Sequence, residues 1–245
     1  SLMKELSVNT VKELETVPYA SLAAAYEKVR PGFIRENRYV GNQPFKNAFY
    51  AGDPLLYGFR RETAQVPILA GTVFGEFSSF VPGNEDRKTA DAKKQTAIVE
   101  AVFGKEHAAE LIPLFEKAYP EHPLCDLVRL DHFFRPGTQK YIRLRSALNG
   151  CTWSYLFNHD MPIDGGSTPW HCADIPYVFH NTQFVPSTQE DGTDGLERLI
   201  FNSVMAFART GMPGHSGLPA WPASTPEAEQ TMIFDTNPVL RPNHD

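Results

Sequence analysis

Two short segments carry residues suited to acid–base chemistry. Glu76 follows an apolar run that ends in Gly71-Thr72-Val73-Phe74-Gly75, and His171 lies in Thr168-Pro169-Trp170-His171-Cys172-Ala173-Asp174. A histidine at the end of a strand is suited to general base catalysis, because its ordinary pKa is the one nearest neutrality. Taken singly, each segment also fits a plainer interpretation. Glu76 then faces solvent in a loop, and His171 is a structural histidine, one of eight in the chain.

Other chemistries fit the residues less well. Cys172 stands next to His171, but neighbouring side chains of an extended strand point in opposite directions, so a buried structural thiol is favoured over a nucleophile. His171, Cys172 and Asp174 do not have the spacing of common zinc ligands, and no metal or cofactor is predicted. The pentapeptide G-x-S-x-G is absent. Its nearest approach, residues 214–218, is typical of a turn.

The elements that must position these residues follow an α/β order. Strands are expected at residues 66–73, 152–157 and 232–234, where short apolar or aromatic runs occur. Helical periodicity predicts two short helices in residues 9–29, broken near Pro18, and a long irregular loop over 31–58. Further helices are expected at 91–119 with a break near Gly104, at 125–148 with an interruption at Pro136-Gly137, and at 196–210. Strands alternating with helices predict parallel α/β packing.

About three parallel strands make a small sheet. Such a sheet leaves one long edge unpaired and much apolar surface uncovered. We therefore expect the chain to associate with an N-terminal half-domain or with another copy of itself.

Four motifs in order resemble the type-B carboxylesterases, which are cholinesterase-like and para-nitrobenzyl esterase-like α/β-hydrolases. Residues 66–76 resemble the family strand VP(V/I)L-G and the motif G-x-N-x-x-E-G that follows it, and residues 155–159 resemble Y-L-(Y/F)-x-F. Residues 171–179 resemble H-x-x-(E/D)-(I/L)-x-(F/Y)-V-F. Residues 207–213 with Trp221-Pro222 resemble F-A-x-T-G-x-P…W-P. The chain departs from the family at Val73, Phe77 and Cys172, where asparagine, glycine and glycine are usual.

The resemblance implies a function and a role for each site residue. Glu76 becomes the acid and His171 the base of a catalytic triad that hydrolyses carboxylic esters, in the chain order Ser…Glu…His. The implied substrates are small aryl or alkyl esters, with Phe74, Phe77 and Trp170 as an apolar lining. The serine and the glycine-rich oxyanion motif belong to the half of the fold that precedes this sequence. Residues 1–245 are thus expected to be the C-terminal portion of one α/β-hydrolase domain, inactive alone because it lacks the nucleophile. The alternatives are a non-catalytic cholinesterase-like recognition domain and an inactive truncated gene product.

Composition narrows the partners and the compartment. The formal net charge is −6 without a basic cluster, which argues against nucleic acid. No apolar run reaches the roughly 18 residues of a membrane span. Three cysteines are a poor disulfide framework, which favours a reducing cytoplasm, although a Cys151–Cys172 bridge stays open as a minor alternative. Residues 1–2, which precede Met3, are expected to be a vector remnant.

Overall fold

A computed structural model of the chain describes residues 1–36, 44, 46–77, 87–148, 150–163, 166–190 and 192–243. It contains two compact units, Ser1–Gly52 and Asp53–Asp245. The expectation of one domain over residues 1–245 stays a prediction.

The first unit is helical. Its elements are α1 (Leu2–Glu5), the 3-10 helix η1 (Lys12–Thr16) and α2 (Tyr19–Arg35). Two segments separated at Pro18 were predicted correctly, but α2 continues through Pro31 into the segment expected to be a loop. Pro31 lies near the last turn of α2, where the ring removes only one of the final backbone hydrogen bonds. Residues 37–43 and 45 of the predicted loop lie outside the described residues.

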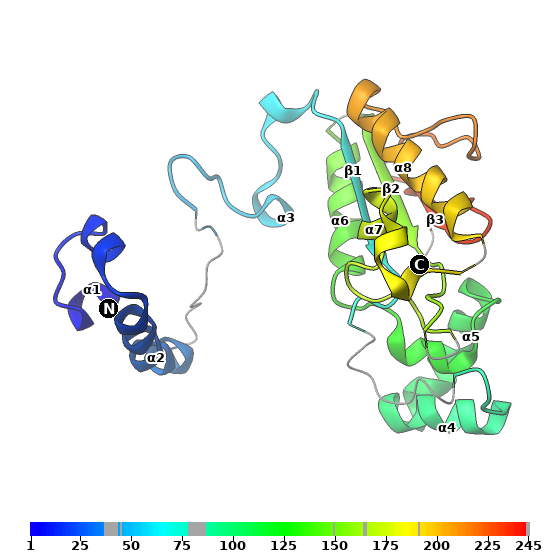
Figure 1. Cartoon of the computed structure of the whole chain (residues 1–245), viewed down its shortest axis with the longest axis horizontal. Helices are drawn as coiled ribbons and strands as arrows, with labels where there is room; N and C mark the ends of the chain where they lie inside the picture. The colour runs from blue at the N-terminus through cyan, green and yellow to red at the C-terminus, as the bar shows by residue number, and fades with distance from the viewer. Residues whose placement is uncertain are drawn as a thin grey trace. The chain divides into compact units, whose positions relative to one another are not determined.

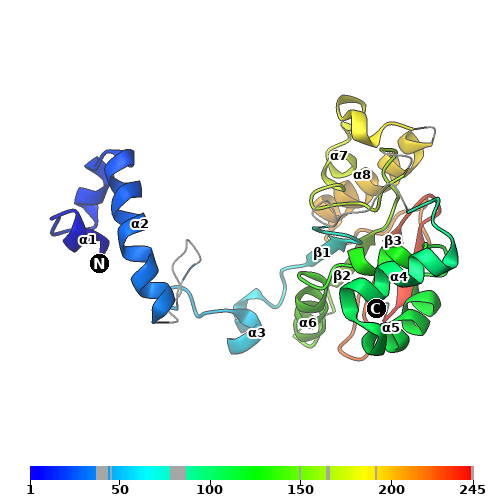
Figure 2. The same cartoon turned by 90° about the horizontal axis from the view of Figure 1, so that it is seen from below.

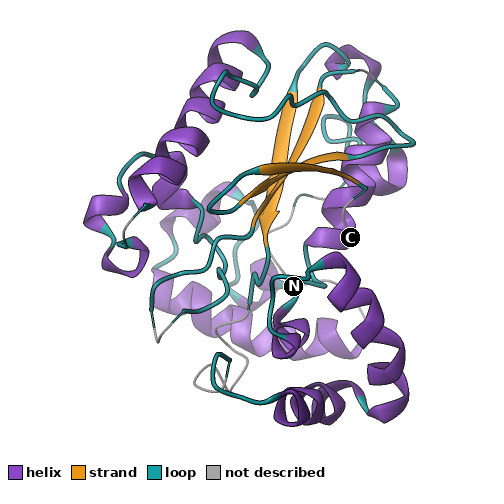
Figure 3. Ribbon diagram, turned by 90° about the vertical axis from the view of Figure 1, so that its right-hand side faces the viewer, coloured by secondary structure: helices purple, strands orange, loops and turns teal. Residues whose placement is uncertain are grey.

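The second unit is built on a sheet in the order β1-β2-β3-β4 (Figure 3). Its strands are β1 (Ile68–Val73), β2 (Thr152–Phe157), β3 (Gln230–Phe234) and β4 (Val239–Pro242). The first three run parallel, which confirms the predicted α/β class, and β4 returns antiparallel to β3. β4 was not predicted. Its flanking Pro238 and its own Pro242 are residues that strands accept at a sheet edge and seldom elsewhere.

The helices before β2 partly match expectation. α4 (Ala92–Phe103) and α5 (Lys105–Ala118) meet at Gly104, whose φ of 78° requires glycine, as the predicted break implies. The helical stretch expected over residues 125–148 is partly right, but its interruption lies before Arg135 and not at Pro136-Gly137. The segment forms the 3-10 helix η5 (Leu124–Arg129) and then α6 (Arg135–Ser146), with Pro136 in the first turn of α6. A proline is well tolerated there, because the first turn has no internal acceptor for its missing N–H. Short elements α3 (Pro54–Tyr57) and η2 (Arg61–Thr63) precede β1.

The chain after β2 forms α7 (Ile175–Val178), η6 (Thr182–Phe184), η7 (Pro186–Thr188) and α8 (Thr193–Thr210). Figure 2 shows the sheet between α7 and α8 on one face and α4, α5 and α6 on the other. Figure 1 labels these elements and colours them by their position in the sequence. Among the described residues, no helix has the length and apolar character needed to cross a bilayer.

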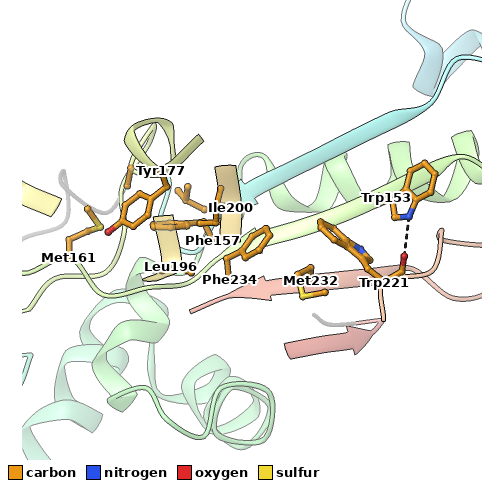
Figure 4. Packing of buried hydrophobic residues seen from close by; sticks show 11 residues of the cluster. Trp153, Phe157, Met161, Tyr177, Leu196, Ile200, Trp221, Met232 and Phe234 are labelled. Carbon is orange, nitrogen blue, oxygen red and sulfur yellow. Dashed lines mark hydrogen bonds between the residues drawn. The ribbon is translucent and has the colours of Figure 1, made fainter. Parts of the chain in front are cut away.

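Each face of the sheet has its own core, because alternate side chains of a strand point to opposite faces. Trp153 and Phe157 of β2 pack with Leu196 and Ile200 of α8, and Trp153 Nε1 donates a hydrogen bond of 3.3 Å to the Trp221 carbonyl (Figure 4). On the other face, Leu156 of β2 belongs to a cluster with residues of α4 and α5. The sheet is therefore held from both sides, and the carboxyl ends of β1 and β2 are fixed relative to each other.

Candidate active site

Glu76 lies just beyond the carboxyl end of β1. The Phe74 N–H donates to the Phe157 carbonyl at 2.9 Å, so the chain still runs alongside β2 as it leaves the strand. It then turns, and Glu76 Oε1 accepts a hydrogen bond of 3.1 Å from the Val73 N–H. The residue is only 6% exposed. A buried carboxylate needs partners, and the turn supplies one of them from its own backbone.

His171 is carried to the same place by the loop that precedes α7. The Gly75 N–H donates to the Pro169 carbonyl at 3.1 Å, and the His171 N–H donates to the Glu76 carbonyl at 2.5 Å. These two bonds join the loop to the turn that holds Glu76. Side chains that are 95 residues apart in the sequence therefore meet, with His171 Nδ1 2.6 Å from Glu76 Oε2.

The contact fixes how the imidazole can react. An ionised carboxylate only accepts hydrogen bonds, so Nδ1 carries the proton and donates it to Glu76. The other ring nitrogen, Nε2, has no hydrogen-bond partner among the described residues, and the His171 side chain is 51% exposed. A neutral imidazole in this tautomer presents a free lone pair on Nε2. It can accept a proton from a hydroxyl group that approaches from outside the chain.

Aromatic rings surround the imidazole. Phe77 and Phe134 stack on it, with ring centroids 5.4 and 5.7 Å away. Phe133 contacts both phenylalanines edge-on, with ring centroids at 5.6 and 5.0 Å. All three phenylalanines are substantially exposed. Sequence reasoning missed Phe133 and Phe134; the only signal was a pair of aromatic residues just before a predicted break.

The expected apolar lining needs correction. Phe74 does not line the site. It is fully buried and stacks on His122 with ring centroids 4.3 Å apart. The alternation of side chains explains this, because Phe74 extends the strand and points to the face opposite Val73. Trp170 packs against the core cluster of the α8 face. Of the three predicted lining residues, Phe77 is the one in contact with His171.

A second polar cluster, also absent from the sequence analysis, lies beyond β2. Arg87 donates to both oxygens of Asp126 at 2.7 Å and to both oxygens of Asp160 at 2.7 and 2.8 Å. His122 links Asp126 to Asn158, with distances of 2.9 and 3.1 Å from its two ring nitrogens. Burial opposes ionisation of Asp126, but His122 and Arg87 outweigh it and hold the pKa of that carboxyl below its ordinary value.

His159 borders this cluster and a cavity of about 370 Å³. Its ring nitrogens lie 3.0 Å from Glu190 and 3.6 Å from Asp235. Burial lowers the pKa of His159, yet Asp235, Glu190 and Asp160 together raise it above the ordinary value. Within the part of the chain that the structure describes, no group of His, Cys, Asp and Glu side chains is arranged to hold a metal ion.

None of Cys125, Cys151 and Cys172 is in a disulfide, so the Cys151–Cys172 bridge is not formed. Cys172 is exposed rather than buried, and its φ is 70°. Ser216 lies in a turn after α8, beside a His215 ring whose two nitrogens contact the Leu199 carbonyl and the Gly217 N–H at 3.1 Å each.

Comparison with known proteins gives a family match over almost the whole chain. The family model described as "Carboxylesterase family" matches residues 3–244. The chain belongs to the carboxylesterase family. An esterase from anaerobic Clostridium hathewayi that can hydrolyze aliphatic aromatic polyesters is 40% identical and superimposes with a TM-score of 0.91, over 100% of this chain and 49% of that one.

More distant relatives share the fold. A thermophilic PNB esterase is 23% identical with a TM-score of 0.63, over 99% of this chain and 50% of that one. The phenmedipham hydrolase of Pseudarthrobacter oxydans is 26% identical over 104 residues, which are 37% of this chain and 21% of that protein. This carboxylesterase-family chain has an α/β-hydrolase-like fold and spans about half the length of these structural relatives.

Proposed function

We propose that this chain takes part in the hydrolysis of carboxylic esters by the serine esterase mechanism, with Glu76 as the acid and His171 as the base. The observation that carries the proposal is the 2.6 Å contact between Glu76 Oε2 and His171 Nδ1, which leaves Nε2 open. Family membership supports the reaction class.

The contact between Glu76 and His171 supports these proposed roles. Glu76 keeps the proton on Nδ1 and holds the ring in place, so that Nε2 can take the proton of a serine hydroxyl as the oxygen attacks the ester carbonyl. The negative charge of Glu76 then stabilises the imidazolium. In the next step Nε2 returns its proton to the departing alcohol, and the acyl group remains on the serine until water releases it by the same route.

The serine is proposed to come from a half-domain that pairs with the outer edge of β1. The sequence holds no G-x-S-x-G, and β1 stands at the end of the sheet, with no neighbour on its outer side among the described residues. Phe133 and Phe134 line a shallow cavity of about 410 Å³ beside Ala70 and Gly71 of that edge. An unpaired edge next to exposed aromatic rings favours association, and a second copy of this chain is the alternative partner.

The substrate class is proposed to be small esters with an aromatic acyl or alcohol group. Phe77 and Phe134 present exposed ring surface beside His171, and Phe133 packs on both, so a substrate ring can stack there. No cofactor is required for this chemistry. The free thiols of the chain agree with the proposed cytoplasmic location.

Fluorophosphonate labelling read by intact mass tests the proposal. We expect no mass gain for this chain alone, because it supplies no activated serine. Mixed with the N-terminal half of the Clostridium hathewayi esterase, it should restore labelling on the serine of that half and hydrolysis of an aryl ester. The same mixture with His171→Gln is the control and should remain inactive. Stoichiometric label on a serine of this chain alone would overturn the assignment.

A further inference from the structure

The loop that carries His171 is anchored at a second point, away from Glu76. Its first part is tied to the Glu76 turn by the backbone bonds from Gly75 and His171. Its last residue, Asp174, accepts a hydrogen bond of 2.8 Å from the hydroxyl of Tyr155 in β2. The loop is thus held to β1 at one end and to β2 at the other.

The position of Tyr155 depends on a glycine in the neighbouring strand. Tyr155 and Gly71 are register partners in the parallel pair β1–β2. A Cβ atom built on Gly71 would lie 2.5 Å from three carbons of the Tyr155 ring. The ring therefore lies directly on the backbone of β1, and only glycine leaves room for it there. From this position the hydroxyl reaches past the edge strand to the loop.

The hydroxyl is a permanent donor. Burial raises the pKa of Tyr155 well above its ordinary value, and the Asp174 and Glu76 carboxylates raise it further. The phenol stays protonated over the whole working range of an esterase, and the bond to Asp174 is a charge-assisted one.

We propose that Tyr155 is a positioning residue that sets the orientation of His171 through Asp174. The inference rests on the proposed function for the role of His171. Gly71 contributes to the same positioning, because its lack of a side chain leaves room for the Tyr155 ring. The loop needs this support, since Cys172 holds a φ of 70° immediately after the histidine, a conformation that non-glycine residues rarely adopt. Without the bond at Asp174, the loop can relax at Cys172 and turn His171 away from Glu76.

The test reads the Glu76–His171 contact itself and needs no catalytic activity. Ring ¹⁵N shifts of His171 in the full chain, measured where the imidazole is neutral, report the ratio of Nδ1–H to Nε2–H tautomers. We expect Tyr155→Phe to lower this ratio about tenfold, the loss that corresponds to one charge-assisted hydrogen bond of about 1.4 kcal/mol. Tyr177→Phe is the matched control. Tyr177 lies in α7, which follows the same loop, and its buried hydroxyl makes no hydrogen bond to Asp174, so the ratio should not change.

Two further variants keep the proposal falsifiable if Tyr155→Phe folds poorly. Asp174→Ala should lower the ratio by the same factor, and the double variant with Tyr155→Phe should lower it no further, because both remove one bond. Asp174→Asn keeps an oxygen that accepts from the phenol and should restore most of the ratio. An unchanged tautomer ratio in folded Tyr155→Phe or Asp174→Ala overturns the proposal. Failure of ester hydrolysis in the reconstituted enzyme, with these shifts behaving as expected, would instead count against the proposed function alone.

Discussion

His171 and His122 are two of the imidazoles in this chain that contact a carboxylate, and they differ in what their second nitrogen does. His171 contacts Glu76 at 2.6 Å, and His122 contacts Asp126 at 2.9 Å. Each ring also stacks on a phenylalanine, Phe77 in the first case and Phe74 in the second. The two sites are thus alike in their residue types.

The two sites differ in whether both ring nitrogens of the histidine have partners. Both nitrogens of His122 are engaged, its side chain is 7% exposed, and Asp126 is shared with Arg87. His171 is half exposed, and its Nε2 has no partner within the described residues. A carboxylate–imidazole pair alone therefore does not identify a catalytic site. The pair that leaves one nitrogen accessible is able to move a proton, whereas the saturated pair cross-links the fold.

The largest expected effect concerns catalysis. In the enzyme reconstituted with a serine-bearing half, His171→Gln should lower kcat by about ten-thousandfold, because the serine then has no base. His122→Gln should change kcat by less than about tenfold when rates are referred to correctly folded protein, since His122 has no free nitrogen to offer. Circular dichroism gives the folded fraction of each variant, because a fluorophosphonate would not label the enzyme that carries His171→Gln. Equal losses of kcat in the two variants would remove the distinction drawn here.

Stability should show the reverse order. Asp126→Ala leaves the buried Arg87 guanidinium and His122 without their shared carboxylate, and we expect a loss of about 3–5 kcal/mol in the free energy of unfolding. Glu76→Gln keeps an oxygen that accepts from the Val73 N–H and should cost less than about 1.5 kcal/mol. Urea unfolding of both variants measures the difference. A larger loss for Glu76→Gln would mean that the catalytic pair, rather than the buried cluster, stabilises this end of the sheet.

The pH dependence of stability should likewise come from the buried side. The folded-state pKa of His159 is raised by Asp235, Glu190 and Asp160 against the effect of burial. Its contribution to stability is therefore complete below its ordinary value of about 6.5 and is lost as the pH rises through the folded value. The free energy of unfolding should fall as the pH rises above about 6.5, and His159→Gln should flatten this decline. His107→Gln, at an exposed position, is the control and should leave the slope unchanged.

At acidic pH, the free energy of unfolding should change with pH in the opposite direction. Burial works against the charged forms of Asp126 and Asp235, but their partners lower both folded pKa values. The stability they contribute is present above their ordinary value of about 3.9 and is lost as the pH falls through the lowered values. Asp126→Ala should therefore remove part of the loss of stability seen below about pH 4. An unaltered acid limb in this variant would contradict the assignment.

Much of the fold could be predicted from sequence because it depends on local patterns. The strand at residues 152–157 was predicted from a run of aromatic and β-favouring residues, and the break at Gly104 from a glycine that the structure holds at a positive φ. β4 could not be predicted, since a Pro-containing tail becomes a strand only when β3 offers an edge. The interruption of the helical stretch over residues 125–148 was misplaced for a similar reason: Asp131 accepts from the N–H groups of Phe133, Phe134 and Arg135 and starts a new helix there.

Some residues of the site could be predicted from the sequence, and others could not. Glu76 and His171 were found through motif resemblance, and the structure brings them together; their catalytic roles stay a prediction. Phe134 and Arg87 could not be found, because each acquires its neighbours only through the tertiary fold. Arg87 binds two aspartates that are 39 and 73 residues away in the sequence. Such a cluster cannot be predicted from local periodicity. In contrast, a strand followed by Gly-x-x-x-Gly-Glu is a contiguous motif that can be recognised in the sequence.

The smallest expected effect lies in the loop that carries His171, at Cys172. Cys172 has a φ of 70° at a position where the resembling family has glycine, so Cys172→Gly should raise the free energy of unfolding by about 0.5–1 kcal/mol. Cys172→Ser removes the thiol but keeps a Cβ, and should bring no gain in urea unfolding. The His171 tautomer ratio should stay the same in both variants, because the anchors at Glu76 and Asp174 are untouched. If Cys172→Ser stabilised the chain as much as Cys172→Gly, the thiol would be the unfavourable feature. The backbone at residue 172 would then not be strained.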